Sequence, residues 1–139
     1  MEQNIAQQIL DLVNEERVKA GVKSLTLNSR LTTAAATYAV NMATEDFFSH
    51  FDPDQKTSPA DRIHNVGYSW QRCGENIAAG NSDPKATMTQ WMNSPGHKAN
   101  ILNPEFTELG VGYFYLEDDS GEVQYKHYWC QVFATPSPH

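Results

Sequence analysis

The sequence has 139 residues, of which 40% are hydrophobic and 19% are charged. This length suits one domain, and the composition is that of a globular protein rather than a disordered one. The net charge is −7, and the lysines and arginines form no cluster, which argues against binding to nucleic acid or to an anionic membrane surface. No apolar run is long enough to cross a membrane, so no transmembrane segment is expected.

The first two-thirds of the chain show helical patterns. Apolar residues recur at helical spacing in 4–21 and in 29–48, with Asn28 and Ser29 as candidate caps of the second helix. Three shorter segments contain a capping residue followed directly by proline, which is typical of helix starts. These segments are 57–68 with Ser58, 82–93 with Asp83 and 94–102 with Ser94.

Strand patterns dominate the last third of the chain. Residues 108–117 and 123–134 are rich in Val, Tyr, Phe and Trp and are joined through "DDSG", which predicts a β-hairpin. The short apolar segment 74–80, "GENIAAG", predicts a further strand. Helices followed by strands indicate an α+β fold, in which helices pack on a small antiparallel sheet. We expect a single domain over 1–139, with a core of about 5–134 and a loose C-terminal tail.

Four polar residues are candidates for a functional site: His50, Glu75, His97 and Glu108. Glu75 lies in an apolar strand pattern, and an unpaired buried carboxylate is costly, so this residue must face a cavity or a partner. Imidazole nitrogen and carboxylate oxygen are also ligands of Zn²⁺, with water completing the coordination. However, His50 and His97 are far apart in the sequence, and a hydrogen-bonded histidine–carboxylate network explains the same residues without a metal. The spacing leaves both interpretations open.

Serine catalysis has little support in the sequence. Ser94 lies three residues before His97, and Ser49 lies directly before His50, but the chain has no Gly-x-Ser-x-Gly turn. Ser94 is better explained as a helix cap, because a proline follows it. No catalytic residue is therefore assigned.

Five segments, in this order along the chain, resemble the CAP superfamily, which comprises cysteine-rich secretory proteins, antigen 5 and plant pathogenesis-related proteins and is also called the SCP domain. They are "DFFSHFDP", "GENIAAG", "WMNSPGHKANIL", "TELGVGYF" and "YWCQVFA". The resemblance runs from about Ile5 to Ala134 and is closest to the prokaryotic branch. It implies a three-layer α-β-α sandwich with a small antiparallel sheet. It also implies secretion or display at the cell surface, with the signal peptide absent from this sequence.

The resemblance assigns roles to the candidate residues. It implies a central cleft in which His50, Glu75 and His97 can hold a divalent metal such as Zn²⁺. The family's second glutamate would fall at or near Ser94 and is absent here, and Glu108 is the candidate to replace it. The resemblance therefore predicts a cleft lined by two histidines, His50 and His97, and two glutamates, Glu75 and Glu108.

The two cysteines, Cys73 and Cys130, lie in strand-like apolar segments. Their positions alone are as consistent with two free thiols as with a disulfide. The resemblance favours a disulfide between them and an oxidising compartment.

Three functions follow as hypotheses. The first is a secreted binding module whose cleft holds a metal ion and an apolar or cell-wall ligand, such as a lipid or a sterol. The second is an interaction domain whose polar cluster only stabilises the fold. The third is a zinc-dependent hydrolase in which Glu75 is the general base. We expect the first, and we expect no enzymatic activity, because the family has no agreed reaction and a fold alone does not define one.

Overall fold

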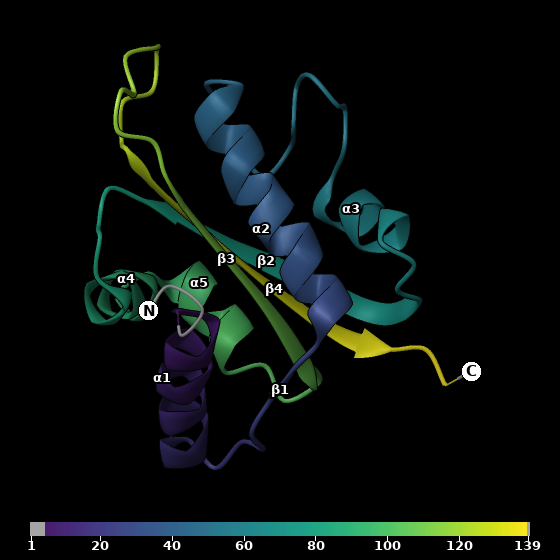
Figure 1. The fold of residues 1–139 in the computed structure, drawn as a ribbon. Coiled ribbons are helices and arrows are strands. Elements are labelled where there is room, and N and C mark those ends of the chain that lie inside the picture. Colours follow the sequence, from purple (N-terminus) through teal and green to yellow (C-terminus); the bar gives the residue numbers. More distant parts are fainter. Residues whose placement is uncertain (1–4, 139) are drawn as a thin grey trace.

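The computed structural model describes residues 5–138, in which five helices and four strands form three layers (Figure 1). The helices and strands follow one another largely as the sequence predicts. In chain order the elements are α1 (Ile5–Lys19), β1 (Thr26–Leu27), α2 (Ser29–Thr44), α3 (Pro59–Asn65), β2 (Trp70–Ala79), α4 (Pro84–Met92), α5 (Pro95–Ile101), β3 (Glu108–Tyr115) and β4 (His127–Pro136).

The sheet has the strand order β1-β3-β4-β2, so β2 and the short β1 lie at its edges. The predicted hairpin is confirmed, because β3 and β4 pair antiparallel, and β2 pairs antiparallel with β4. The short strand β1 pairs parallel with β3, so the sheet is antiparallel except at this edge. Its two residues lead directly into α2, and they carry no periodic pattern that could have revealed a strand.

The C-terminal residues extend the sheet beyond the expected core limit. β4 continues to Pro136, and the amide of Ser137 donates a hydrogen bond of 3.0 Å to the carbonyl of Ser69. His139, at the end of the predicted loose tail, lies outside the described residues.

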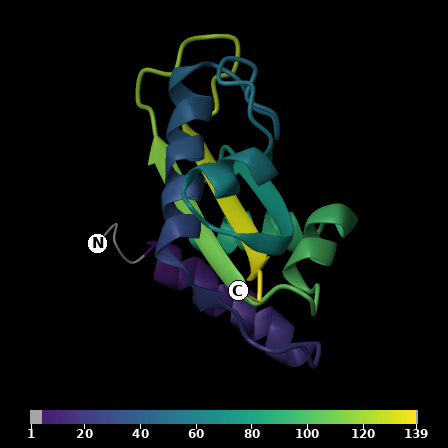
Figure 2. The same ribbon diagram turned by 90° about the vertical axis from the view of Figure 1, so that its right-hand side faces the viewer.

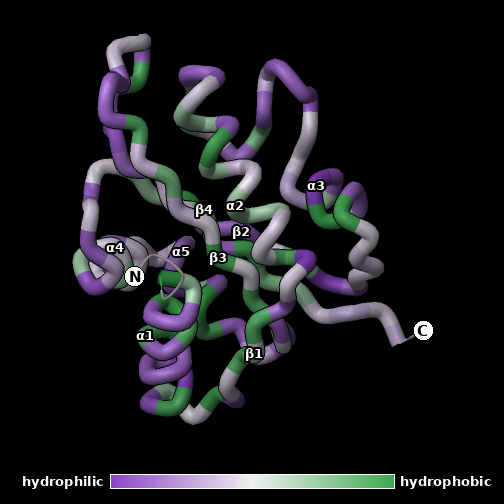
Figure 3. Tube along the Cα trace, in the orientation of Figure 1, coloured by the Kyte–Doolittle hydropathy of each residue, from purple (hydrophilic) through white to green (hydrophobic). Residues whose placement is uncertain are grey.

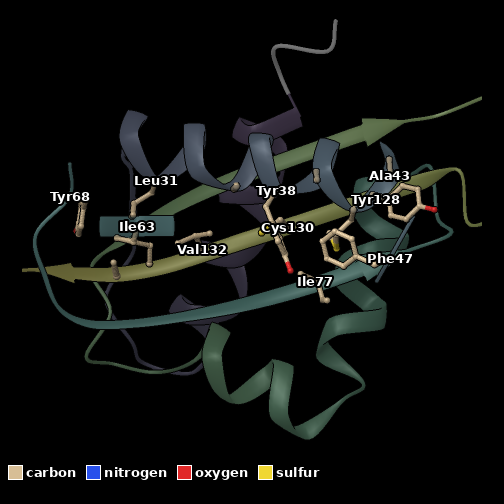
Figure 4. Packing of buried hydrophobic residues seen from close by; sticks show 14 residues of the cluster. Leu31, Tyr38, Ala43, Phe47, Ile63, Tyr68, Ile77, Tyr128, Cys130 and Val132 are labelled. Carbon is tan, nitrogen blue, oxygen red and sulfur yellow. The ribbon is translucent and has the colours of Figure 1, made fainter. Parts of the chain in front are cut away.

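Helices α2 and α3 cover one face of the sheet. Side chains of alternate β4 residues, such as Cys130 and Val132, enter a core with Tyr38 of α2 and Ile63 of α3 (Figure 4). Figure 2 shows α2 on one side of the strands and the α4–α5 region on the other. The fold is therefore the expected α-β-α sandwich.

Helices α1, α4 and α5 cover the opposite face. Hydrophobic and hydrophilic residues alternate along α1 (Figure 3), and Ile9 and Val13 are fully buried on its inner side. They pack in one cluster with Trp91 of α4 and with Trp129 and Phe133 of β4. The odd-numbered residues of β4 thus serve this second core.

Two glycines of β3 allow α2 to pack directly on the sheet. A Cβ atom at Gly110 would lie 2.1 Å from the carbonyl carbon of Leu31, and one at Gly112 would lie 2.4 Å from that of Ala35. Any larger residue would push α2 away from the strand. The close approach fixes where the C-terminal end of α2, and the loop that follows it, lie above the sheet.

The predicted helix caps are found at their expected positions. Asn28 accepts hydrogen bonds from the first turn of α2, Ser58 forms a capping box with Asp61, and Asp83 caps α4. Ser94 occupies the N-cap position of α5, but its side chain makes no capping hydrogen bond.

A buried arginine ties α1 to the segment between α5 and β3. The guanidinium of Arg17 donates to the carbonyl oxygens of Lys23 at 2.6 Å, Ile101 at 2.8 Å, Asn103 at 3.0 Å and Phe106 at 3.1 Å. These four acceptors satisfy a cation that is 1% exposed. They also hold the C-terminal end of α5 in place.

The predicted disulfide between Cys73 and Cys130 is wrong, because both thiols are free. In the pairing of β2 with β4, the residue opposite Cys130 is Ile77, whereas Cys73 lies opposite Ala134. Four strand positions correspond to about 13 Å, and disulfide formation requires Cα atoms within about 7 Å. The register of the two strands, which the resemblance did not reveal, separates the cysteines.

Candidate functional site

His50 and Glu75 form a hydrogen-bonded pair at the surface. His50 lies in the loop after α2, and its Nδ1 is 2.8 Å from Oε1 of Glu75 on β2. Because an ionised carboxylate can only accept, Nδ1–H donates, and the neutral ring keeps its lone pair on Nε2. The side chain of His50 is 52% exposed and that of Glu75 is 1% exposed. The ring therefore connects a buried acid to solvent.

Arg62 of α3 neutralises Glu75 and holds the loop that carries His50. Its Nη2 is 2.7 Å from Oε2 of Glu75 and donates to the carbonyl of His50 at 2.9 Å, while Nη1 donates to the carbonyl of Thr57 at 2.8 Å. The guanidinium carbon also lies 3.3 Å from the centre of the Tyr38 ring, a cation–π contact. Arg62 is thus the partner that the buried carboxylate requires.

The other ionisable groups of this cluster stay protonated. Burial, reinforced by the nearby Glu75, raises the pKa of the Cys130 thiol well above its usual value, and the thiol contacts Oε2 of Glu75 at 3.5 Å. Burial also raises the pKa of Tyr38, whose hydroxyl donates to the carbonyl of Ser49. Neither group can serve as a nucleophile near neutral pH.

A network of side-chain amides fixes α5 on β2. Asn76 Nδ2 donates to the carbonyl of His97 and to Oε1 of Gln131, both at 3.0 Å. Asn100 Nδ2 donates to Oδ1 of Asn76 at 2.9 Å and to the carbonyl of Glu75 at 3.2 Å. These bonds hold the first turn of α5, and with it His97, against the strand.

His50 and His97 lie on opposite sides of the edge strand β2. Successive strand residues point to opposite faces, so Glu75 faces the α2–α3 layer and Asn76 faces α5. His50 therefore comes from one layer and His97 from the other. Burial, followed by the charge of His50, lowers the pKa of His97.

Glu108 does not join this group. Its Oε1 accepts hydrogen bonds from the hydroxyl of Tyr68 at 2.6 Å and from Nδ2 of Asn28 at 3.4 Å. It lies opposite Ala134, whereas Glu75 lies opposite Val132. Two strand spacings and two residues separate the acids, or about 12 Å. Of the four candidate residues, the structure joins His50 directly to Glu75, and only the backbone carbonyl of His97 is tied to the neighbouring Asn76.

The sequence matches the family described as "CAP: Cysteine-rich secretory protein family" over residues 10–133. The chain belongs to the CAP family. The predicted resemblance is therefore confirmed over nearly the whole chain.

Bacterial relatives support this assignment. The Bacillus subtilis protein YkwD is 38% identical over 125 residues, which cover 90% of this chain and 45% of YkwD. An extracellular protein of Bacillus anthracis with an SCP domain has a solved structure that is 32% identical, with a TM-score of 0.81, over 95% of this chain and 40% of that one. This CAP domain thus spans less than half the length of these two relatives.

A further structure shares the fold at low identity. An outer surface protein of Borrelia burgdorferi is 21% identical, with a TM-score of 0.83, and the match covers 94% of this chain and 92% of that one. Among residues 5–138 of this CAP domain, no helix is long and apolar enough to cross a membrane.

Glu75 of this CAP domain is poorly placed to be a metal ligand. Within residues 5–138, no three His, Cys, Asp or Glu side chains are grouped so that they could hold a metal ion. Both oxygens of Glu75 are engaged, by His50 and by Arg62, so this carboxylate can orient a ligand more readily than it can be one. The side chain of Glu75 is also only 1% exposed behind His50 and Arg62, which argues against its role as a general base.

The sequence analysis missed the residues that build the site around the histidines. Asn76 and Gln131 are polar residues in apolar strands, the same signal that singled out Glu75, and both are completely buried. Arg62 gave no signal, because an arginine in a short amphipathic helix is usually exposed. Its role depends on contacts with residues that are distant in the sequence.

Proposed function

We propose that this CAP domain is an extracellular binding module that holds a divalent transition metal through His50 and His97. The observation that carries the proposal is the hydrogen bond from Nδ1 of His50 to the buried Glu75. Metal-binding histidines usually donate their second nitrogen to a carboxylate in this way, which orients the ring and makes it a better ligand. The location is supported by the relatives described as an extracellular protein and an outer surface protein.

Each residue has a defined part in this proposal. Glu75 fixes the tautomer of His50, and the lowered pKa of His97 keeps that ring neutral and able to bind a metal at pH 7. Two protein ligands leave coordination positions for water or for a bound molecule. Phe51, which follows His50 and is 51% exposed, offers an apolar contact to such a molecule. A lipid, a sterol or a cell-wall component is the ligand class we propose.

Calorimetric titration with Zn²⁺ at pH 7.5 tests the metal site. We expect binding to the wild-type protein and none to the double variant His50→Ala, His97→Ala. His64→Ala is the matched control, because His64 is exposed on α3 and lines a different surface pocket with Tyr68 and Trp70, and it should bind as the wild type does. Glu75→Gln should bind about 10–100-fold more weakly.

A second function is favoured by the complete engagement of Glu75. If the polar cluster only stabilises the fold, Zn²⁺ will release equal, negligible heat with the wild type and with the double variant. Glu75→Gln will then lower the melting temperature without affecting any binding. That result would reject the metal site and leave an interaction domain with a buried ion pair.

A further inference from the structure

A second pair of acids lies at the base of the loop that carries His50. Glu45 caps the C-terminal end of α2, and Asp52 lies seven residues further on and is completely buried. Both acids contact Gln55, whose backbone amide donates to Oδ1 of Asp52 at 3.0 Å and whose side chain donates to Oε2 of Glu45 at 3.5 Å. Oε1 of Glu45 and Oδ2 of Asp52 are both buried, and neither has a hydrogen-bond partner.

The rest of Asp52 is held firmly in place. Its Oδ1 accepts hydrogen bonds from the amides of Asp54 at 2.9 Å and Gln55 at 3.0 Å, and its backbone pairs with Thr57. These bonds fix the carboxyl group of Asp52 and leave Oδ2 without a donor. The orphaned oxygen is therefore a fixed feature of the loop and not a surface side chain with many rotamers.

Nothing in the described chain balances the charge of this pair. Of the ion pairs formed within residues 5–138, none involves Glu45 or Asp52. Burial, followed by the hydrogen bond and the charge of Asp52 and the charge of Asp54, raises the pKa of Glu45, which reflects the cost of bringing the negative groups together. Such a pair is stabilised either by a bound cation or by a shared proton.

We propose that Glu45 and Asp52 form a binding site for a hard divalent cation such as Ca²⁺. Carboxylate oxygens are the ligands that such cations prefer. Gln55 supplies a third oxygen, because its side-chain amide already lies 3.5 Å from Oε2 of Glu45 and can present its carbonyl by rotating. Gln55 also lines a cavity of about 200 Å³, together with Thr57 and Asn41.

The consequence of cation binding would be a tighter attachment of the His50 loop to α2. With only two carboxylates, the expected dissociation constant is about 10⁻⁴–10⁻³ M, the range of extracellular calcium modules. The site is separate from the histidine pair and does not depend on the proposed transition-metal function.

Thermal denaturation with CaCl₂, compared with KCl of equal ionic strength after treatment with EDTA, tests the proposal. At 10 mM Ca²⁺ and a dissociation constant of about 1 mM, the ratio of folded to unfolded protein rises about tenfold, and the melting temperature rises with it. We expect this rise for the wild type and for the His50→Ala, His97→Ala variant. It should disappear in Glu45→Gln and in Asp52→Asn, and Glu45→Gln remains informative if the buried Asp52 variant fails to fold.

Asp118→Asn is the matched control, because it removes the same charge from an exposed position in the β3–β4 loop and should keep the full response. The proposal is overturned if calcium leaves the wild type unchanged, or if Glu45→Gln responds as the wild type does. A third outcome also overturns it: calcium has no effect, and the melting temperature of the wild type falls as the pH rises from 5 to 8, whereas that of Glu45→Gln does not. That result would show that a shared proton balances the pair.

Discussion

Arg62 is the residue on which the histidine site most depends. It contacts the side chain of Glu75, the backbone of His50 and the ring of Tyr38, and so joins β2, the loop after α2 and α2 itself. Its guanidinium provides several donors in fixed directions, which a lysine cannot reproduce. The site is therefore built around an ion pair that is almost completely removed from water.

Arg62→Met should lower the free energy of unfolding by about 3–5 kcal/mol, because it leaves the carboxylate of Glu75 buried without a cation. Urea denaturation measures the loss. The control is Arg72→Met, which breaks an ion pair of 3.0 Å with Glu105 whose two side chains are 56% and 54% exposed. An exposed pair of this kind contributes at most about 1 kcal/mol. Equal losses in the two variants would show that Arg62 does not neutralise Glu75.

Among the elements, α2 and β3 make a close contact that a substitution can probe. Gly110 and Gly112 face the backbone of α2, and the helix continues into the loop that carries His50 and Asp52. The distance between α2 and β3 therefore determines where the loop that carries His50 and Asp52 lies relative to the sheet.

Gly112→Ala should destabilise the protein by about 1–3 kcal/mol or more, because its Cβ would lie 2.4 Å from backbone atoms of Ala35. Gly96→Ala is the matched control, since a Cβ there meets no atom within 4 Å and alanine favours the helix. Thermal denaturation of both variants measures the difference. Similar melting temperatures would mean that α2 can move away from β3 without cost.

The elements were predictable where the signal is local. Helices were recognised from periodicity and from caps such as Ser58 and Asp83, and the hairpin from its two strand patterns and its turn. Strand β1 was missed because two residues carry no periodicity, and its parallel pairing depends on the position of β3. The cysteine pairing failed for a related reason, since strand register is decided by contacts that are distant in the sequence.

The candidate site shows the same limit. The spacing of His50 and His97 left two interpretations open, and only the resemblance to a family predicted that they would lie together. The exclusion of Glu108, by contrast, follows from its place on β3, which β4 separates from β2. The Glu45–Asp52 pair was not predicted, because two acids in a loop usually face water.

At the scale of the whole molecule, two histidines make folding sensitive to pH. Burial and the charge of His50 lower the pKa of His97 from 6.5, and burial and the charge of Lys126 lower the pKa of His127 from 6.5. In the folded protein these rings take up a proton only below the pH at which the unfolded chain does. Protonation therefore favours the unfolded state.

The melting temperature should consequently change little above pH 7 and fall as the pH decreases below about 6.5. The double variant His97→Gln, His127→Gln should show a smaller decrease between pH 6.5 and pH 5. The pKa values of acids such as Asp46 and Asp61 are lowered from their ordinary value of 3.8, so these acids affect the melting temperature only at lower pH. If the melting temperature of the wild type and of the variant depended on pH in the same way, folding would not lower the pKa of either histidine.

The adjacent positions of Glu75 and Asn76 have a consequence for how the chain finds its fold. One side chain belongs to the ion pair above the sheet and the other to the amide network below it. If β2 slipped by a single residue against β4, every side chain would change face. Glu75 would then face the side-chain amides, and Asn76 would face Arg62. The misaligned sheet would contain an unpaired carboxylate in one layer and an unpaired guanidinium in the other. Glu75 and Asn76 thus destabilise the shifted register of β2, whether or not any ligand is ever bound.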